Sequence, residues 1–369
     1  MRTWAEIDLD NLEYNINKIK ELSHDRDIMA IIKADAYGMG AVTIAKELSE
    51  MGVKIFGVSS LEEGIELRNN GITNDILILA GTFNEELEDA ERNNLQVTLT
   101  DLSQIDYIYK NKLALNVHIK VDTGMGRVGF TVEEGKKAIE ICKNKNINVV
   151  GVYSHLSVSD ESDEESISYT KKQLEKFKYF EKLEEIKYIH ILNSGGILKF
   201  SEIPQSNLVR AGIIMYGVYG EGVIENLKRV FTLKSRILFL KELKEDIDIS
   251  YGRVGKGYKN ELIATITVGY ADGFRRELSN KGTVQIHGIP CKIVGKVCMD
   301  MLMIKIPEEL KTKVKIGDEV IVMGEDIFEK SKMVGSSIYE LFTGLSRRVS
   351  RVYLKRGKPH VVNSLIGKL

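Results

Sequence analysis

The chain is poor in the residues that mark specialised protein classes. Its 369 residues include three cysteines, four prolines and one tryptophan. The cysteines, Cys142, Cys291 and Cys298, are odd in number and lack the spacing of a zinc site. Such usage is typical of a reducing compartment. We therefore expect a cytoplasmic protein without a bound metal.

The chain also lacks an excess of one charge and a long apolar run. Its 52 basic and 53 acidic residues leave a formal net charge of −1, which gives no electrostatic reason to expect nucleic acid or an anionic membrane as a partner. No apolar run approaches the roughly 20 residues that span a bilayer. The start, "MRTWAEIDLD", does not have the pattern of a signal peptide. We expect a globular protein.

From residue 28 onward, short β-branched runs alternate with longer helical patterns. Strictly alternating strands and helices predict a parallel sheet. Eight such units predict an α/β fold with an N-terminal (β/α)8 barrel, and a doubly wound open sheet is the alternative. The expected strands begin at residues 28, 54, 75, 96, 115, 148, 187 and 207.

The pattern changes after about residue 227. Short strand-like runs, separated by glycine, proline or charged turns, then follow one another without intervening helices. One helix is expected near "VGSSIYELFTGL". We therefore predict two domains, a barrel over residues 1–227 and a mostly-β domain over residues 228–369.

Polar residues gather where the barrel strands are expected to end. In such barrels the loops after the strands meet at one mouth, which holds the active site. Any one of these residues could be an ordinary loop or structural residue, but together they predict a site. They are Lys33 and Tyr37 after the first strand, Lys120 and Arg127 after the fifth, His155 after the sixth, Asn193 and Ser194 after the seventh, and Arg210 and Gly212 at the eighth.

The loops after the last two strands favour a phosphate. Barrel phosphate sites commonly use these loops, where backbone amides and helix starts bind an anion. Here they read "NSGGIL" and "RAGIIMYG", with Ser194 at the expected helix cap, although simple capping would need no ligand. A lysine close to a phosphate site indicates pyridoxal 5′-phosphate, which forms a Schiff base with a lysine. Lys33, which ends a buried strand, is the expected lysine.

A second glycine motif indicates another function. "GMGRVG", residues 124 to 129, matches the G-x-G-x-x-G pattern of dinucleotide-binding proteins. It follows the fifth strand rather than the first, and no acidic residue closes the next strand as a ribose ligand. A dehydrogenase is therefore the less favoured hypothesis.

At this point the motifs resemble those of the bacterial alanine racemases, which belong to pyridoxal-phosphate fold type III. The similarity covers about residues 3 to 354, with the motifs in the same order. They are "WAEIDLDNLEYN", "KADAYGMG", "KVDTGMGRVGF", "NSGG", "NLVRAGIIMYG", "SYG", "VGYADG" and "VGKVCMD". The resemblance implies a homodimer in which each active site combines the barrel of one subunit with the β domain of the other.

The resemblance also implies a role for each matching residue. Lys33 would hold the cofactor covalently, and Lys120 matches a lysine that is often carbamylated and orients Arg127. Tyr251 would be the second catalytic base, contributed by the partner subunit. The cofactor would be bound by Tyr37, His155, Asn193, Ser194, Arg210, Gly212 and Ile213, and the substrate by Arg127, Tyr270, Met299 and Asp300.

The residue types fit racemisation, which needs one base on each face of the cofactor. Lys33 can serve one face, and Tyr251 the other if its phenol ionises below the usual pKa of about 10. A nearby Arg127 would favour the phenolate. Arg210 would donate to the ring nitrogen without protonating it, because a guanidinium keeps its proton. Such a ring withdraws electrons less strongly, which disfavours transamination.

The chain departs from the family pattern at several positions. Asp35 and Met39 replace an asparagine and a histidine in "KADAYGMG". Arg347 stands where some members have a tyrosine that restricts substrate size, and "YSHLSVSDESDEE" is similar to racemase domains of the serine/alanine type. We expect an isomerase that interconverts L- and D-alanine for peptidoglycan. An alanine/serine racemase is the main alternative, and a related decarboxylase or a non-enzymatic pyridoxal-phosphate-binding protein is less favoured.

Overall fold

The computed structural model describes residues 1–202, 206–220, 222–223 and 226–368. By their contacts these residues form two compact units. The barrel unit is Leu12–Lys228, and the β unit combines Met1–Asn11 with Arg229–Leu369. The domain boundary at residue 227 stays a prediction, and it differs from these units in the placement of the first eleven residues.

The barrel unit contains an eight-stranded sheet in which every neighbouring pair is parallel. The order of the strands is β8-β7-β6-β5-β4-β3-β2-β9. All eight strands predicted from the sequence are present. They are β2 (Asp27–Ile31), β3 (Ile55–Val58), β4 (Asp75–Ile78), β5 (Gln96–Leu99), β6 (Asn116–Lys120), β7 (Asn148–Tyr153), β8 (Tyr188–His190) and β9 (Leu208–Ala211).

The two edge strands of this sheet, β8 and β9, are joined by backbone hydrogen bonds around their ends. The Asn207 N–H donates to the Ile189 carbonyl at 3.1 Å, and the Arg210 N–H donates to the Leu192 carbonyl at 3.0 Å. The sheet is therefore a nearly closed (β/α)8 barrel, as predicted, and not the doubly wound open sheet that was the alternative.

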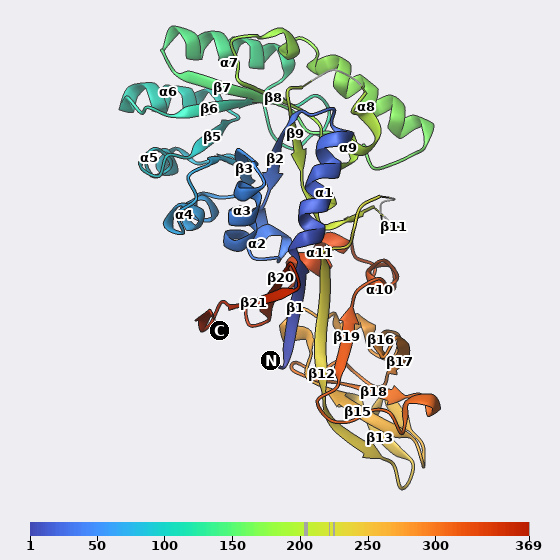
Figure 1. Cartoon of the computed structure of the whole chain (residues 1–369). Helices are drawn as coiled ribbons and strands as arrows, with labels where there is room; N and C mark the ends of the chain where they lie inside the picture. Colours follow the sequence, from blue (N-terminus) through green and yellow to red (C-terminus); the bar gives the residue numbers. More distant parts are fainter. Residues whose placement is uncertain (203–205, 221, 224–225, 369) are drawn as a thin grey trace. The chain divides into compact units, whose positions relative to one another are not determined.

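Helices cover the outside of the barrel strands, as Figure 1 shows. Several begin at a side chain that caps the first turn. In α7, for example, the Thr131 hydroxyl accepts from the Glu134 N–H, and the Glu134 carboxylate accepts from the Thr131 N–H. These helices are α1 (Leu9–Leu22), α3 (Ala41–Glu50), α4 (Leu61–Asn69), α5 (Leu87–Arg92), α6 (Leu102–Asn111), α7 (Val132–Asn144), α8 (Glu164–Phe177) and α9 (Ser194–Phe200).

The β unit is built on a ten-stranded sheet with the order β15-β18-β17-β16-β19-β12-β1-β20-β21-β22. A further pairing of β12 with β15 closes six of these strands into a small barrel. The strands are β1 (Thr3–Asp8), β12 (Phe231–Glu242), β15 (Leu262–Ile266), β16 (Thr283–Ile286), β17 (Ile289–Ile293), β18 (Leu302–Ile306), β19 (Glu319–Met323), β20 (Ser350–Lys355), β21 (Lys358–Asn363) and β22 (Gly367–Lys368).

The first strand of the chain belongs to this sheet. β1 runs antiparallel to β12 and parallel to β20. A separate hairpin, β13 (Ile247–Ile249) and β14 (Gly255–Gly257), also lies in the β unit. The predicted mostly-β fold is confirmed. The expected helix is α11 (Ile338–Thr343), and a second helix, α10 (Ile327–Val334), was not predicted.

Two general features of the described residues bear on function. None of their helices combines the length and apolar character needed to cross a membrane. Over the same residues, no group of three or more histidine, cysteine, aspartate or glutamate side chains is placed to hold a metal ion.

Candidate active site

Lys33 stands at the mouth of the barrel, two residues after β2. It begins a short turn, α2 (Lys33–Tyr37), whose backbone is left-handed. Ala34, Asp35 and Ala36 have φ angles of 51°, 55° and 53°, and Tyr37 has 56°. Each such residue costs roughly 1–2 kcal/mol, because its Cβ approaches the following carbonyl. A run of four strained residues beside a lysine is typical of a functional site.

Two carboxylates hold this turn in place. Glu63 accepts from the Ala34 N–H at 2.7 Å and from the Ser59 N–H at 2.6 Å, so it links the loops that follow β2 and β3. Asp35 accepts from the Ala41 N–H at 2.7 Å, at the start of α3. Asp35 thus has a local structural contact at the position where the family pattern has asparagine.

The environment of Lys33 favours its neutral amine. The side chain is partly buried, and burial lowers its pKa below the ordinary value. The positive charge of Arg127 acts in the same direction, and so does that of Arg210. Because a neutral amine is the nucleophilic form, this setting suits a lysine that reacts with a carbonyl group.

The hydroxyl groups of Tyr37 and Ser194 converge on Gly212. A Cβ atom added to Gly212 would stand 2.8 Å from the Tyr37 hydroxyl and 3.6 Å from the Ser194 Oγ. The Gly212 N–H donates to that Oγ at 3.3 Å. Ile213 follows directly and begins a short 3₁₀ helix (Ile213–Tyr216). A side chain at residue 212 would collide with the Tyr37 hydroxyl, so only glycine lets both hydroxyl groups lie against the backbone here. We call this group of polar atoms the recess at Gly212.

The cap of helix α9 differs from the expectation. Asn193, not Ser194, caps the helix, and its Oδ1 accepts from the Gly196 N–H at 3.0 Å. The same oxygen accepts from the Ser159 hydroxyl at 2.7 Å. Since Asn193 takes the capping role, the Ser194 hydroxyl is left to face Gly212.

Arg210 lies inside the barrel, where it is 3% exposed. Its Nη1 donates to the His190 carbonyl at 3.0 Å and contacts the His190 Nδ1 at 2.9 Å. Its Nη2 donates to the carbonyls of Ser154 and Ile191 at 2.8 and 3.0 Å, and the His155 Nδ1 lies 3.3 Å away. Burial lowers the pKa of Arg210 to about 10, so it remains a cation at neutral pH.

Lys120, at the end of β6, is also buried. Its Nζ donates to the Val121 carbonyl at 3.2 Å and lies 5.0 Å from the centre of the Tyr153 ring. Burial and the charge of Arg210 lower its pKa to about 7. His155 is held neutral, because burial and the same arginine lower its pKa well below the ordinary value. Arg127 lies on the exposed loop that follows β6.

The loop "GMGRVG" does not offer a dinucleotide site. The Asp122 carboxylate accepts from the N–H groups of Gly124, Met125 and Gly126, each at 2.8 Å. A pyrophosphate would need such amides to be available. Because these three amides already donate to the Asp122 carboxylate, they are not available to a pyrophosphate, and the structure gives no support to the dehydrogenase hypothesis.

The other predicted residues lie in the β unit. Tyr251, Tyr270 and Met299 are 70%, 43% and 52% exposed. The N–H groups of Tyr270 and Ala271 donate to the carbonyls of Cys298 and Met299, both at 3.0 Å. Next to Tyr251, the Ser250 hydroxyl donates to the Lys296 carbonyl at 2.7 Å. The structure therefore brings the segments that carry Tyr251, Tyr270, Met299 and Asp300 together within this unit.

A buried carboxylate fixes one side of this group. Asp272 is 1% exposed and accepts from the Arg348 Nε at 2.7 Å and from the Arg2 Nη2 at 3.2 Å. Arg348 in turn donates from Nη2 to the Asp300 carboxylate at 2.7 Å. Asp272 thus fixes the position of Arg348, and Arg348 fixes the carboxylate of Asp300. The neighbouring Arg347 is exposed.

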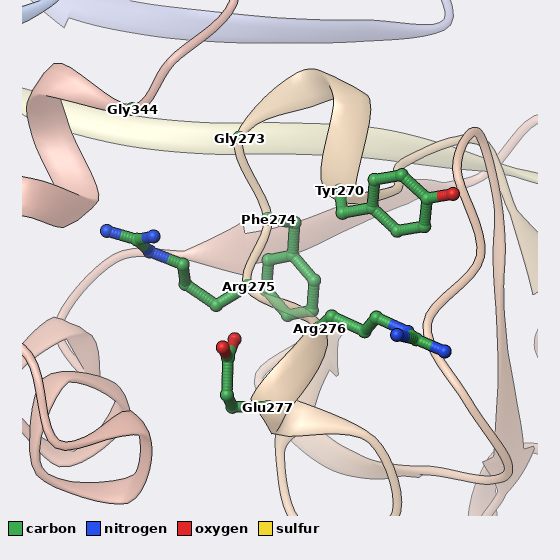
Figure 2. A pocket seen from close by; sticks show the side chains of 7 residues that line it. All are labelled: Tyr270, Gly273, Phe274, Arg275, Arg276, Glu277 and Gly344. Atoms are coloured by element: carbon green, nitrogen blue, oxygen red, sulfur yellow. The ribbon is translucent and has the colours of Figure 1, made fainter.

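Tyr270 also borders a cavity of about 380 Å³ in the β unit. Figure 2 shows Arg275 and Arg276 extending to opposite sides of Phe274, with Arg276 on the side of Tyr270. Arg275 is paired with Glu340 at 3.0 Å. The cavity contains arginines and a tyrosine but no lysine that could react with a carbonyl, so it is not a second site of the kind found in the barrel unit.

Sequence reasoning missed several residues that shape the barrel site. Glu63 holds the Lys33 turn, and Asp122 shapes the Arg127 loop. His190, His118 and Gln96 lie behind Arg210. A signal existed for the last three, since each is a polar residue within a run that the sequence predicts to be a barrel strand.

The residues of the barrel unit fit pyridoxal phosphate. Lys33 offers an amine of lowered pKa, and the recess at Gly212 offers two hydroxyl groups and a backbone that a phosphate oxygen could approach. In the described part of the chain, the Arg210 Nε–H makes no hydrogen bond, whereas Nη1 and Nη2 do. One charged donor is therefore left for a ring nitrogen.

Comparison with known proteins agrees with this chemistry. Residues 7–220 match the family described as "Alanine racemase, N-terminal domain", and residues 230–353 match "Alanine racemase, C-terminal domain". The alanine racemase of Fusobacterium nucleatum is 44% identical over 352 residues, covering 95% of this chain and 99% of that protein. That of Carboxydothermus hydrogenoformans is 39% identical, with coverage of 95% and 99%.

Solved structures give the same result. The alanine racemase of Clostridium difficile 630 is similar with a TM-score of 0.92 and 38% identity, over 99% of both chains. The enzyme of Bacillus anthracis, solved with bound L-Ala-P, gives a TM-score of 0.89 and 31% identity over 99% of this chain and 98% of that one. The resemblance seen in the sequence motifs is confirmed, and this chain belongs to the alanine racemase family.

Proposed function

We propose that this protein is an alanine racemase that uses pyridoxal 5′-phosphate to interconvert L- and D-alanine. The observation that carries the proposal is the position of Lys33 beside the recess at Gly212. β2 and β9 are neighbours in the barrel, with Ala30 paired to Ala211, so Lys33 and Gly212 leave adjacent strand ends. A lysine of lowered pKa and a two-hydroxyl recess thus lie at one mouth.

Each residue of the barrel unit has a distinct task. Tyr37, Ser194, Gly212 and Ile213 would hold the phosphate of the cofactor, and Arg210 would donate from Nε to its ring nitrogen. His155 would lie beside the ring, while Asn193 fixes the start of the α9 helix. When bound, pyridoxal phosphate supplies an electron sink that makes the Cα proton of an amino acid removable.

Proton transfer falls to two bases on opposite faces. The Lys33 amine takes the Cα proton on one face or returns it there. Tyr251 of the partner subunit does the same on the other face. Because the proton can leave from one face and return on the other, the configuration at Cα can be inverted in either direction. The exposure of Tyr251 supports a role in the active site of another subunit, since 70% of the residue is exposed and so available for contact with a partner. The protein is therefore proposed to act as a homodimer with shared sites.

Arg127 would bind the substrate carboxylate, and Met299, Asp300 and Tyr270 of the partner subunit would line the carboxylate site and the entrance. Lys120 is proposed to carry a carbamate, which requires a neutral amine. Its pKa of about 7 supports this, because a large fraction of the amine is neutral near physiological pH. The product, D-alanine, would supply peptidoglycan synthesis in the cytoplasm.

A second candidate function is a broader alanine/serine racemase. It is favoured by Arg347, an exposed residue at the position of a tyrosine that restricts substrate size in some members of the family. The segment "SHLSVSD" after β7 favours the same alternative. Measurable racemisation of serine alongside alanine is the expected result.

The test is a racemisation assay with added pyridoxal phosphate on alanine, serine, lysine and glutamate. Alanine should be the best substrate, and a serine rate equal to the enzyme-free control would exclude the broader function. Borohydride reduction should fix the cofactor mass on the peptide that contains Lys33. Label on another lysine, or an inactive wild-type protein, would refute the proposal.

A further inference from the structure

Four side chains form a hydrogen-bonded network across the interior of the barrel. Arg210 of β9 contacts the Nδ1 of His190 in β8 at 2.9 Å. The His190 Nε2 lies 3.2 Å from the Nδ1 of His118 in β6, and the His118 Nε2 lies 2.8 Å from the Oε1 of Gln96 in β5. None of the four is more than 4% exposed. We call these residues the Arg210 network.

The chemistry of arginine sets the direction of every bond in this network. A guanidinium has donors and no acceptor, so the His190 Nδ1 must accept and cannot carry a proton. The proton of His190 is then on Nε2, which donates to the His118 Nδ1. By the same reasoning His118 is protonated at Nε2, which donates to the Gln96 Oε1. Arg210 therefore fixes the tautomer of a histidine that it does not touch.

Packing prevents the two imidazole rings from leaving these positions. The His190 ring is stacked on Tyr153, with ring centres 4.7 Å apart, and the His118 ring is stacked on Tyr188 at 5.8 Å. Gly151 makes room for His118, since a Cβ atom there would stand 2.0 Å from its Nδ1. Burial keeps both rings neutral: it lowers the pKa of His118 to about 3 and that of His190 well below the ordinary value.

An anion lies at the far end of the network. Although burial would raise it, the pKa of Asp75 is lowered by hydrogen bonds from Tyr188, Lys187 and Gln96. The Tyr188 hydroxyl donates to the Asp75 carboxylate at 2.7 Å. The network thus runs from a cation at Arg210 to an anion at Asp75, with each donor aimed toward the anion. Such an order strengthens successive hydrogen bonds.

We infer that His190, His118 and Gln96 are positioning residues that aim the Nε–H of Arg210 at the ring of the cofactor. This inference rests on the proposed function, in which that N–H meets the ring nitrogen. With Nη1 held by His190, and Nη2 by the carbonyls of Ser154 and Ile191, the guanidinium has one orientation. Loss of His118 would leave the His190 Nε2–H without its acceptor, so the His190 ring would no longer be held in one orientation against the Arg210 Nη1.

The first test measures the tautomers directly. The full-length holoenzyme is labelled with ¹⁵N in its histidine rings, and the spectra are assigned by single substitutions. His190 and His118 should both be neutral and protonated at Nε2. A charged ring, or a proton on Nδ1 of either residue, would overturn the inference. This measurement does not depend on activity, so an inactive but correctly protonated wild-type protein would refute the proposed function alone.

The second test removes the network without touching the proposed cofactor site. His118→Phe keeps the ring volume but loses both nitrogens, and Tyr188→Phe is the matched control, stacked on the same ring and outside the Arg210 contact. His118→Phe should shift the Arg210 ¹⁵Nε signal, shift the His190 ¹⁵Nε2 signal because that N–H loses its acceptor, and weaken pyridoxal-phosphate binding by about tenfold or more. Tyr188→Phe keeps both imidazole rings and loses only the hydroxyl that donates to Asp75, so it should change all three much less than His118→Phe does.

Gln96→Leu guards against a folding defect in His118→Phe. It removes the last acceptor of the network together with the hydrogen bond from Gln96 to Asp75, and it should move the His190 and Arg210 signals in the same direction by a smaller amount. An Arg210 signal and a cofactor affinity that equal wild type in the folded variants would overturn the inference.

Discussion

The hydroxyl oxygen of Tyr37 stands 2.8 Å from the point that a Cβ atom on Gly212 would occupy. Tyr37 ends the left-handed turn, and its hydroxyl can lie this close because residue 212 has no side chain. Gly212→Ala should therefore weaken pyridoxal-phosphate binding by roughly 10- to 100-fold, the equivalent of about 1.4–2.8 kcal/mol. Titration of the apoenzyme, followed by cofactor absorbance, measures this.

A double-mutant cycle with Tyr37→Phe identifies the cause. If the new methyl group opposes the hydroxyl, then Gly212→Ala should do less harm in the Tyr37→Phe background than alone. Strictly additive losses would show that the methyl group acts elsewhere, and an unchanged affinity in Gly212→Ala would place the phosphate outside this recess.

Replacing Arg210 with glutamate should change the outcome of the reaction. A carboxyl group can keep a proton on the ring nitrogen, whereas a guanidinium with a pKa of about 10 donates without giving its proton away. Racemisation should slow, and the fraction of turnovers that end in transamination should rise. Pyruvate formed per racemisation event reports this ratio, and the same ratio as wild type would contradict the electronic role of Arg210.

Carbamylation of Lys120 should be visible and dependent on pH. Because its folded pKa is lowered to about 7, the reactive neutral amine is present above this pH and is lost as the pH falls below it. With ¹³C-labelled bicarbonate at pH 8, a carbamate signal is expected that weakens by pH 6. Lys120→Ala should abolish this signal, while the variant of an exposed lysine, Lys137→Ala, should keep it. A signal that survives in Lys120→Ala would contradict the assignment.

The shared active site predicts complementation between inactive subunits. Lys33→Ala and Tyr251→Phe each remove one of the two bases. In a mixed dimer, one site collects both defects and the other has both bases intact. Joint refolding of equal amounts makes about half the dimers mixed, so activity should return toward about a quarter of the wild-type value.

Each variant refolded alone is the control and must remain inactive. Mass analysis should confirm that mixed dimers are present. If the mixture with such dimers gains no activity, Lys33 and Tyr251 must act from the same chain.

The barrel could be predicted from the sequence because its strands are short, buried and separated by helices with an apolar face. The positions of Lys33, His155 and Arg210 at strand ends followed from the same pattern. Helix α10 could not be predicted in the same way. It has only eight residues, its N-cap Asp326 makes no capping hydrogen bond, and it contains a buried lysine, Lys330.

The supporting residues of the site were harder to find, because their contacts join segments far apart in the sequence. Glu63 acts on the site by accepting a hydrogen bond from the Ala34 amide. His118 acts on it through a hydrogen bond with His190, and these two histidines are 72 residues apart in the sequence. The left-handed turn could not be predicted either, since alanine and aspartate rarely adopt that conformation. Its only local sign is the pair of glycines that follow, Gly38 and Gly40.

The left-handed turn after Lys33 limits how the enzyme could be engineered for heat resistance. Glycine at Ala34 would remove a Cβ that costs roughly 1–2 kcal/mol in this conformation, so Ala34→Gly is expected to raise the melting temperature. The same change would loosen the backbone next to the catalytic amine. Thermal resistance and turnover should therefore move in opposite directions at this turn, and stabilising substitutions are better sought on the outer helices of the barrel.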